Sequence, residues 1–447
     1  MSEPSDLERY PTLTEHGRRM LQRLREHPCA PMFRNESGNR LTPDDVATVR
    51  AFEREVAEAE VPEQREESAA WLTEFLQRVY REVPFYRALG GAPRRLSDVP
   101  TISRGDLGHD VARFVPDSAP VARLINFRTS GTTGHPLLIA SHPIVAASYL
   151  AFHRRALARF GVTLRARRGE VGVALLGYQR KCFTYVSVTP TLDEAGLVKL
   201  NLYPDDWREP EDRRKYLEEL APEVLAGDPI SFVELLKLRA ELRPRALLST
   251  SMALLPALRR ALEGAFHCPV VDLYSLNEAG PVAAFDPACG GHVLLQHRML
   301  VEILDVRGKA LPNGERGEVT LTGGFNFCLP LVRYRTGDFA SLARSGAESV
   351  LVGLEGRAPV RFRTPAGVWL NNIEVTHALG PFALHQFQLQ QHADGSLVLR
   401  VAGLGSRESE LRAALLQLFG AEQALAIAEL DAGEGKLLQY SSELEPR

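Results

Sequence analysis

The sequence contains few cysteines, no marked excess of either charge and no long apolar run. Its five cysteines are scattered and odd in number, which indicates a reducing cytoplasm rather than a disulfide framework. The net charge of −3 gives no global basic field for nucleic acid or an anionic membrane, although local groups can still bind a small anion. No apolar run approaches the ~18 residues that span a bilayer, and the N-terminus does not resemble a secretory signal. We therefore expect a soluble cytoplasmic protein.

The length of the chain predicts two domains, because a single hydrophobic core rarely grows beyond about 250–300 residues. We expect a helical arm over residues 1–82 that is part of the large domain, the rest of that domain over 83–355, and a small mobile domain over 356–447. Within the arm, residues 41–81 are predicted to be helical, with Thr42 as N-cap and Pro43 at the first helical position. Frequent acidic residues indicate that this arm is solvated.

Short apolar runs alternate with amphipathic stretches up to Leu273, which indicates buried parallel strands covered by helices on both faces. After Leu295 strands and turns dominate, and the final unit combines strands with one helix. The predicted fold class is therefore α/β, a large N-terminal domain with mostly parallel sheets flanked by helices plus a small C-terminal α+β domain. The expected strands are 121–127, 171–176, 224–226, 246–248, 270–273, 300–305, 318–322, 387–391, 397–401 and 424–430, and the expected helices are 142–159, 213–220, 230–242, 255–266 and 408–419.

A loop rich in glycine and hydroxyl side chains, Arg128–Pro136, follows the first of these strands. Its two glycines permit close backbone approach, and its hydroxyls and amides could surround phosphate oxygens. The loop lacks the Gly-Lys-Ser/Thr that ends a Walker A motif, which disfavours a P-loop kinase or GTPase. By composition alone, an ordinary polar turn explains these residues equally well.

Four segments in order resemble motifs of the adenylate-forming superfamily, which comprises acyl-CoA synthetases, adenylation domains and luciferases. Thr129–Gly134 resembles the phosphate loop, Tyr274–Glu278 the aromatic-to-glutamate motif, and Tyr334–Asp338 the Tyr-Arg-Thr-Gly-Asp motif. Gly356-Arg357, followed by Gly367 and Glu374, resembles the motif that opens the small domain. Any one of these motifs is weak evidence, whereas four in order are strong.

The phenylacetate-CoA ligase-like branch is the part of the superfamily that the chain resembles most. Val83–Arg87, Leu96–Pro100 and Gly291–Val293 all resemble segments of that branch. The resemblance, which runs from about Val83 to the end of the chain, implies ATP-dependent activation of a carboxylic acid to an acyl-AMP and transfer of the acyl group to coenzyme A.

The resemblance also implies roles for individual residues. A carboxylate at Glu278, after a predicted strand end, can hold Mg²⁺ that bridges ATP and the substrate; a surface-loop glutamate is the alternative. Tyr274 could stack on adenine or close the core, Asp338 could bind both ribose hydroxyls or sit in an ordinary turn, and Arg357 could reach ribose or phosphate or be an exposed hinge residue. The implied nucleotide contacts are Thr129, which is also counted as catalytic, and Ser130, Gly131, Thr132, Thr133, Gly134, Tyr274, Ser275, Asn277, Asp338 and Arg357.

Lys436 is the third implied catalytic residue, beside Glu278 and Thr129. In the superfamily a lysine near the C-terminus meets the reacting carboxylate and the α-phosphate. Two anions must approach each other in this reaction, and a positioned ammonium offsets their repulsion. The alternative is a solvated lysine in a polar tail.

Two departures from the family pattern concern the hinge and the adenine site. Pro359 stands where relatives commonly have aspartate or lysine, and proline restricts a pivot between two half-reactions. Ser249–Ala253 replaces a Gly-Gly-Glu or Gly-Ala-Glu stretch. These departures put the transfer step in more doubt than adenylation.

The acyl pocket is predicted to be lined by residues 171–186 and 272–280, with Arg180 or Lys181 facing a polar substituent. Its aromatic residues indicate an aryl or compact acid, although helix surface and core positions explain each residue as well. The candidate pocket residues are Tyr178, Phe183, Tyr185, Ala279 and Gly280.

Cys289 and His292, with His297 and Cys328, could suggest zinc, but their spacing is not that of a common finger. A buried cysteine and a satisfied histidine are the preferred interpretation. No Gly-x-Ser-x-Gly nucleophile motif is present.

Three hypotheses follow. The first is a ligase that uses ATP, Mg²⁺, a small carboxylic acid and coenzyme A, without a nucleic-acid or membrane partner and with a possible homodimer implied by the family alone. The second keeps the adenylation but transfers the acyl group to a carrier-protein thiol or an amine. The third is a nucleotide-binding protein without turnover, which only the two departures support.

Overall fold

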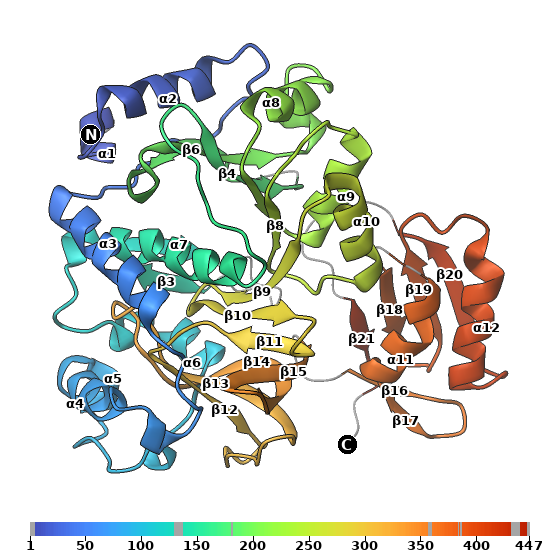
Figure 1. Ribbon diagram of the computed structural model, residues 1–447. Coiled ribbons are helices and arrows are strands. Elements are labelled where there is room, and N and C mark those ends of the chain that lie inside the picture. The colour runs from blue at the N-terminus through green and yellow to red at the C-terminus, as the bar shows by residue number, and fades with distance from the viewer. Residues whose placement is uncertain are drawn as a thin grey trace.

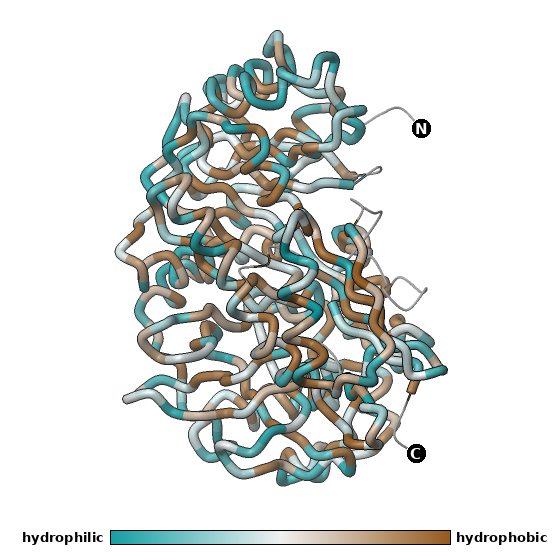
Figure 2. The backbone as a smooth tube through the Cα atoms, turned by 90° about the vertical axis from the view of Figure 1, so that its right-hand side faces the viewer, coloured by the Kyte–Doolittle hydropathy of each residue, from teal (hydrophilic) through white to brown (hydrophobic). Residues whose placement is uncertain are grey.

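The computed structural model describes residues 5–128, 137–179, 182–355, 360–382, 384, 387–430 and 439–444. Figure 1 shows a large body of sheet and helices and, at the right, a smaller lobe that carries β16 to β21. In the turned view of Figure 2, apolar segments run through the interior and hydrophilic segments dominate the outer loops. None of the helices in these ranges has the length and apolar character needed to cross a lipid bilayer.

Thirteen strands form one sheet in the order β12-β13-β14-β15-β11-β10-β9-β8-β7-β4-β6-β5, with β1 beside β14. The α/β class is confirmed: β6, β4, β7, β8 and β9 are parallel neighbours, and the strands from β9 to β12 are antiparallel. The bounds are β1 Ile102–Ser103, β4 Val171–Gly177, β5 Tyr185–Thr189, β6 Ala195–Asn201, β7 Val224–Gly227, β8 Ala246–Ser249, β9 Val270–Leu276, β10 Gly280–Asp286, β11 Gly291–Leu294, β12 Met299–Leu304, β13 Arg316–Gly323, β14 Leu331–Ser345 and β15 Glu348–Glu355.

Helices cover both faces of the parallel strands, as the continuous apolar runs predict. Alternate residues of β7 and β8 point to opposite faces: Leu225 and Leu247 pack with α8, α9 and α10, whereas Val224 and Leu248 pack with α7. The bounds of these helices are α7 Pro143–Ala158, α8 Asp212–Leu220, α9 Pro229–Leu238 and α10 Pro256–Phe266. Helix α9 ends before the predicted residue 242 because Arg239 adopts a left-handed conformation.

The predicted strand over 121–127 is partly wrong. Residues Val121–Arg123 form a 3₁₀ turn, and strand β2 begins only at Ile125. This strand, Ile125–Arg128, pairs with β3, Leu138–Ser141, in a separate two-stranded sheet. The Arg123 guanidinium donates to the Asp45 carboxylate, which fixes the turn against the N-terminal segment.

The N-terminal arm differs from its prediction in two ways. Its helical stretch is interrupted between α3 (Pro43–Glu58) and α4 (Leu72–Glu82), where the sequence contains Pro62. The arm is also packed rather than fully solvated, since the Phe52 ring of α3 lies 5.7 Å from the Phe152 ring of α7. The Thr42 cap is confirmed, because its hydroxyl accepts from the Asp45 amide in a capping box. The other helices before α7 are α1 Asp6–Arg9, α2 Glu15–Glu26, α5 Pro84–Arg87 and α6 Arg104–His109.

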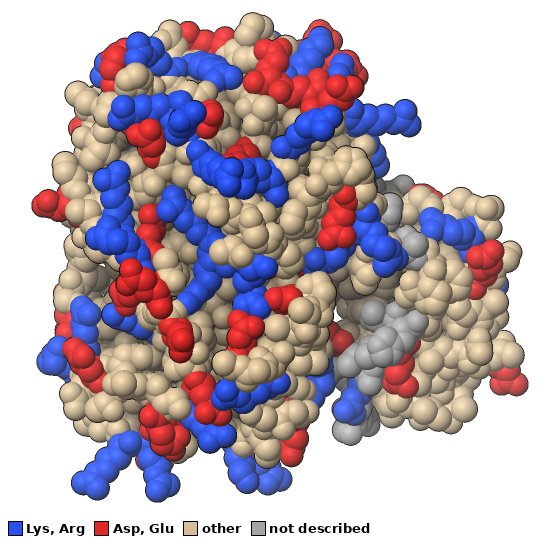
Figure 3. Space-filling view, viewed as in Figure 1, with Lys and Arg blue, Asp and Glu red and all other residues tan. Residues whose placement is uncertain are grey.

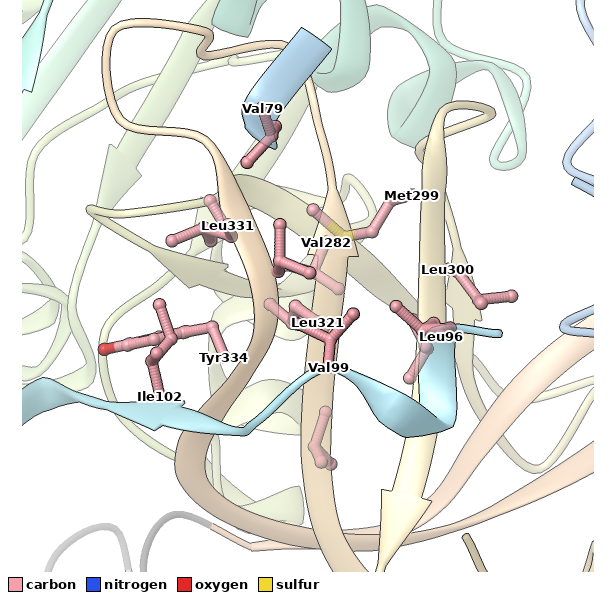
Figure 4. Close-up of a cluster of buried hydrophobic side chains, with 14 of the residues drawn as sticks. Val79, Leu96, Val99, Ile102, Val282, Met299, Leu300, Leu321, Leu331 and Tyr334 are labelled. Atoms are coloured by element: carbon pink, nitrogen blue, oxygen red, sulfur yellow. The ribbon is translucent and has the colours of Figure 1, made fainter. Parts of the chain in front are cut away.

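Helix α4 and the segment after it close one side of the antiparallel half of the sheet. Figure 4 shows Leu96, Val99 and Ile102 lying across the strands that carry Leu300, Leu321 and Tyr334. This cluster includes Ile102 of β1 and Tyr334 of β14. The core therefore fixes the strand that contains the Tyr-Arg-Thr-Gly-Asp motif.

Gly323, the last residue of β13, is a position where we expect a large loss of stability on substitution. Its φ is +99°, and a Cβ atom there would lie 2.5 Å from the Arg298 carbonyl oxygen and as close to the Trp71 ring. We expect Gly323→Ala to lower the free energy of unfolding by about 2–4 kcal/mol in urea denaturation. Gly346→Ala is the matched control, because that residue also has positive φ but no atom near its Cβ. Equal losses in the two variants would contradict the steric argument.

The smaller lobe has its own four-stranded sheet, in the order β20-β19-β18-β21, and its own core around Phe362, Leu399 and Leu415. The three strands and the helix that were predicted here match β18, β19, β20 and α12 within a residue or two, whereas β16, β17, α11 and β21 were not predicted. The domain boundary expected near Gly356 stays a prediction, because residues 356–359 lie outside the described ranges. The elements are β16 Arg361–Arg363, β17 Trp369–Asn371, α11 Asn372–Leu379, β18 Phe387–Gln391, β19 Leu397–Val401, α12 Glu408–Phe419, β20 Leu425–Glu429 and β21 Tyr440–Ser442.

Two separate segments of the large body hold the lobe against it. Glu355, the last residue of β15, forms an ion pair with Arg316 and accepts from the Asn372 side-chain amide. Leu255, just before α10, packs against the core of the lobe. On the face drawn in Figure 3, positive and negative side chains are interspersed over the large body.

Candidate active site

The candidate site is centred on Glu278, which follows strand β9 at the carboxyl edge of the parallel strands. Its carboxylate is only 4% exposed. The Tyr334 hydroxyl donates to Oε1 at 3.2 Å, and the Arg104 guanidinium lies 3.3 Å from the same oxygen. Burial and the negative charge of Glu278 raise the pKa of Tyr334, which keeps that hydroxyl protonated and able to donate.

A second pair lies beside this centre. The Tyr274 hydroxyl donates to Oδ2 of Asp338 at 2.8 Å. Burial, with the charge of Asp338, raises the pKa of Tyr274 well above its ordinary value, so the phenol stays neutral. Tyr334 is close enough to both Glu278 and Asp338 for their charges to raise its pKa as well. Residues from β9 and β14 that are far apart in the sequence therefore meet in one polar cluster.

The local fold of the Tyr-Arg-Thr-Gly-Asp segment explains how Asp338 reaches this cluster. The pairing of β14 with β13 shifts register next to Thr336, which is typical of a β-bulge. The Thr336 hydroxyl accepts from the Asp338 amide and donates to the Val319 carbonyl. Gly337 has a φ of +79°, a conformation that L side chains rarely adopt. The bulge turns the strand and directs Asp338 towards Tyr274.

The structure thus brings together Tyr274, Glu278 and Asp338 from the predicted set. Ser275 pairs with Pro281 between β9 and β10, and Asn277 is exposed, with its carbonyl accepting from the Tyr149 hydroxyl. The remaining predicted contacts lie outside the described residues and stay predictions. They are Thr129, Ser130, Gly131, Thr132, Thr133, Gly134, Arg357 and Lys436, together with Arg180, Lys181 and Pro359.

The surroundings of the Glu278 carboxylate fit a magnesium ion that a nucleotide also binds. Both of its hydrogen bonds from described residues reach Oε1, so Oε2 is not engaged by that part of the chain. In the described ranges no group of three or more metal-binding side chains occurs. Magnesium in nucleotide sites uses one or two carboxylates together with phosphates and water. A single buried carboxylate therefore suits this metal in the form of its nucleotide complex.

The strand order separates the two groups of residues predicted to line the acyl pocket. Tyr178 follows β4, and Tyr185 begins β5, which are three and five strand positions from β9. At about 4.8 Å per strand, these positions lie about 14 and 24 Å from β9. Phe183 is 52% exposed. Ala279 and Gly280, in contrast, are buried directly beside Glu278.

Sequence reasoning missed Arg104, Tyr149 and Phe325, which the structure places at the same edge. A Cβ atom on Gly280 would lie 2.7 Å from the Phe325 ring and 3.4 Å from the Tyr149 ring. The Tyr149 hydroxyl donates to the carbonyl of Asn277, the residue before Glu278, and burial and the charge of Glu278 raise the pKa of Tyr149 to about 12. Arg104 carries no motif signal, whereas Tyr334 lies within a motif that was recognised.

The described residues include the four considered for zinc, and no three metal-binding side chains gather among them. The Cys289 thiol lies 3.5 Å from the Glu348 carboxylate, within an ion-pair cluster of Arg159, Asp286 and Glu348. His292 lies 3.8 Å from Asp272 instead. All five cysteines are in the described ranges, and all are free thiols.

Comparisons with known proteins agree with the motifs. No protein-family model matches the chain. Phenylacetate-coenzyme A ligase from Aromatoleum evansii is 35% identical over 98 residues, 21% of this chain and 22% of that protein. The enzyme of the same name from Thermus thermophilus is 28% identical over 309 residues, 62% of this chain and 66% of that protein. The chain thus spans less than two thirds of the length of these curated relatives.

Solved structures give the same fold at low identity. 2-Hydroxyisobutyryl-CoA ligase in a complex with 2-HIB-AMP aligns with a TM-score of 0.65 and 16% identity, over 86% of this chain and 91% of that one. The open conformation of that ligase, with 2-HIB-AMP and CoA, aligns with a TM-score of 0.53 over 83% of this chain and 89% of that one. The curated relatives carry the name phenylacetate-coenzyme A ligase, and the solved structures have the fold of an acyl-CoA ligase, which agrees with the resemblance of the four motifs to the adenylate-forming superfamily.

Proposed function

We propose that the protein is an AMP-forming ligase that activates a compact carboxylic acid with ATP and transfers the acyl group to coenzyme A. The observation that carries this proposal is the meeting of Tyr274, Glu278 and Asp338 in one partly buried cluster. Three residues from two separated motifs share one site, which an accidental match of either motif would not require. The names of the curated relatives and the CoA complexes of the structural neighbour support the same activity.

The described residues would act by binding and orientation. Asp338 offers a carboxylate to the two ribose hydroxyls, and the Tyr274 ring offers a face to adenine. Glu278 would hold Mg²⁺, which supplies positive charge to the phosphates and to the developing transition state. Tyr334 donates to Glu278 and so fixes the orientation of its carboxylate. In the first step a carboxylate oxygen attacks the α-phosphorus, and pyrophosphate leaves with the electrons of the broken P–O bond.

Residues outside the described ranges complete the proposal. The loop Thr129–Gly134 would surround the phosphates, Arg357 would reach the ribose or a phosphate, and Lys436 would lie between the two reacting anions. In the second step a thiol sulfur attacks the acyl carbon, AMP leaves, and the thiol proton passes to solvent. Coenzyme A is the proposed acceptor because the curated relatives carry it in their names. A carrier-protein thiol or an amine is the second candidate.

The test is pyrophosphate release from ATP and Mg²⁺ with a panel of aryl and short-chain acids, followed by mass spectrometry of the products with coenzyme A present. We expect some acids to stimulate pyrophosphate release and to give an acyl-CoA product. Stimulation of pyrophosphate release without an acyl-CoA product would instead favour a carrier-protein thiol or an amine as the acceptor. Binding of ATP without stimulation by any acid would overturn the enzymatic function and leave a nucleotide-binding protein.

A further inference from the structure

Helix α7 places two side chains one turn apart at the candidate site. Tyr149 and His153 are four residues apart, so they lie on the same face of the helix, and their ring centroids are 6.5 Å apart. Tyr149 is at the end nearer the reacting groups, because its hydroxyl donates to the Asn277 carbonyl at 3.3 Å. His153 is therefore about one helical turn, or about 5.4 Å, farther from Glu278 along the helix axis.

Aromatic rings pack around Tyr149. The Phe325 ring lies 5.5 Å from Tyr149 in an edge-to-face arrangement and 5.0 Å from Phe152. The Phe325 ring also occupies the space that a side chain at residue 280 would need. Gly280 therefore allows contact with Phe325 and does not leave an open space. Flat rings pack well against other flat rings, so this aromatic cluster favours an aryl group over a long flexible chain.

His153 is an uncommitted polar group beside this aromatic cluster. Burial lowers the pKa of His153 to about 4, so its imidazole is neutral at pH 7. The ring is only partly shielded from solvent, and in the described part of the chain neither ring nitrogen has a hydrogen-bond partner. A neutral imidazole has one donor and one acceptor nitrogen. It therefore matches a hydroxyl group, which can also donate and accept, better than a charged substituent.

We propose that His153 selects the acid by hydrogen bonding to a hydroxyl group on a single aromatic ring, with the carboxylate of that acid held at the Glu278 end of Tyr149. This inference rests on the proposed function and narrows its substrate to hydroxylated aryl acids. His153 is a specificity-determining residue in this view, and Tyr149 and Phe325 enclose the ring. A site built to bond a hydroxyl discriminates strongly against an acid that lacks one where the bound ring excludes water, since the polar group of the site is then left unpaired.

The experiment compares pairs of acids that differ only in a hydroxyl, such as benzoate with its 3- and 4-hydroxy derivatives, and phenylacetate with its own. We measure kcat/KM for pyrophosphate release by the full-length wild-type protein, His153→Phe and His153→Gln. The wild-type protein should prefer at least one hydroxylated acid over its parent by about 100-fold or more. His153→Phe should lose most of that preference because kcat/KM falls for the hydroxylated acid. For the parent acid, kcat/KM should stay within a few-fold of the wild-type value. His153→Gln, which retains a donor and an acceptor, should keep part of the preference.

Two controls separate this proposal from others. His16→Phe changes an exposed histidine on α2 and should leave every ratio unchanged. Thermal unfolding and ATP affinity of the His153 variants should match those of the wild type. Binding of each acid in the presence of a non-hydrolysable ATP analogue provides a readout without turnover. If no acid releases pyrophosphate, the proposed function fails, and the binding ratios still decide the role of His153. An equal preference in wild type and His153→Phe, in either assay, overturns the assignment.

Discussion

Replacing Glu278 by glutamine is expected to reduce kcat/KM for pyrophosphate release by about 100-fold or more, since groups that stabilise transition-state charge typically contribute that much. Glutamine has the same shape and can still accept from Tyr334, so the change removes charge with little change in volume. The expected loss has its origin in metal binding: a neutral amide oxygen is a weaker ligand for Mg²⁺ than a carboxylate. The effect should therefore be largest at low magnesium and smaller at saturation.

The measurement is a magnesium titration of pyrophosphate release at fixed ATP and acid. We expect the half-saturating magnesium concentration to rise in Glu278→Gln, together with a lower rate at saturation. Removal of the charge also breaks the ion pair between Glu278 and Arg104, so thermal unfolding is measured in parallel. Glu315→Gln, at an exposed turn residue, is the matched control. Wild-type rates across the whole titration would exclude Glu278 as the metal ligand.

The parallel half of the fold could be predicted because its strands are short continuous apolar runs. The residues of β7 and β8 are buried on both faces of the sheet, and nearly all of them are apolar. In the antiparallel half only 300–305 and 318–322 were predicted as strands, and β10, β11, β14 and β15 were missed. The sequence also does not state which strand pairs with which. Strand β14 illustrates this: it pairs with β13, β15 and β1, which come from both sides of it in the sequence.

The candidate site shows the same division. Tyr274, Glu278 and Asp338 could be named because they lie in motifs with a recognised order. Arg104 could not, because an arginine at the start of a short helix has no distinctive pattern, and only the folded chain places it beside Glu278. The predicted acyl pocket combined two segments, 171–186 and 272–280, whose separation across the sheet depends on strand order. Sequence spacing alone contains no information on that order.

The position of the small lobe against the large body also depends on packing contacts that the sequence does not reveal. Leu255 follows Ser249–Ala253, the stretch that departs from the family pattern beside the expected adenine position, and it packs against the core of the small lobe. The Glu355–Asn372 contact lies at the other end of the same interface. A change in the position of the small lobe between two half-reactions would break both contacts. These contacts would therefore oppose such a movement whatever the effect of Pro359, which lies outside the described residues.

The largest effect is expected from Lys436→Ala. The proposed role of this ammonium is confined to the first step, in which the carboxylate and the α-phosphate approach each other. Loss of a positioned charge in such a step typically costs about 10²–10³ in rate. ATP affinity should change by only a few-fold, because the phosphate loop, Asp338 and Tyr274 would still bind the nucleotide. The measurement is single-turnover formation of acyl-AMP, with ATP affinity determined separately for the same variant.

The second step supplies the control within the same protein. Chemically prepared acyl-AMP, added with coenzyme A, bypasses the step that Lys436 is proposed to assist. Lys436→Ala should therefore convert it to acyl-CoA at close to the wild-type rate, whereas a variant that is merely unfolded would lose both steps. Lys309→Ala, at an exposed turn after β12, should leave both rates unchanged. Unchanged single-turnover adenylation in Lys436→Ala would remove this residue from the active site. Equal losses in both steps would show that it supports the fold or a shared conformation instead of the reacting anions.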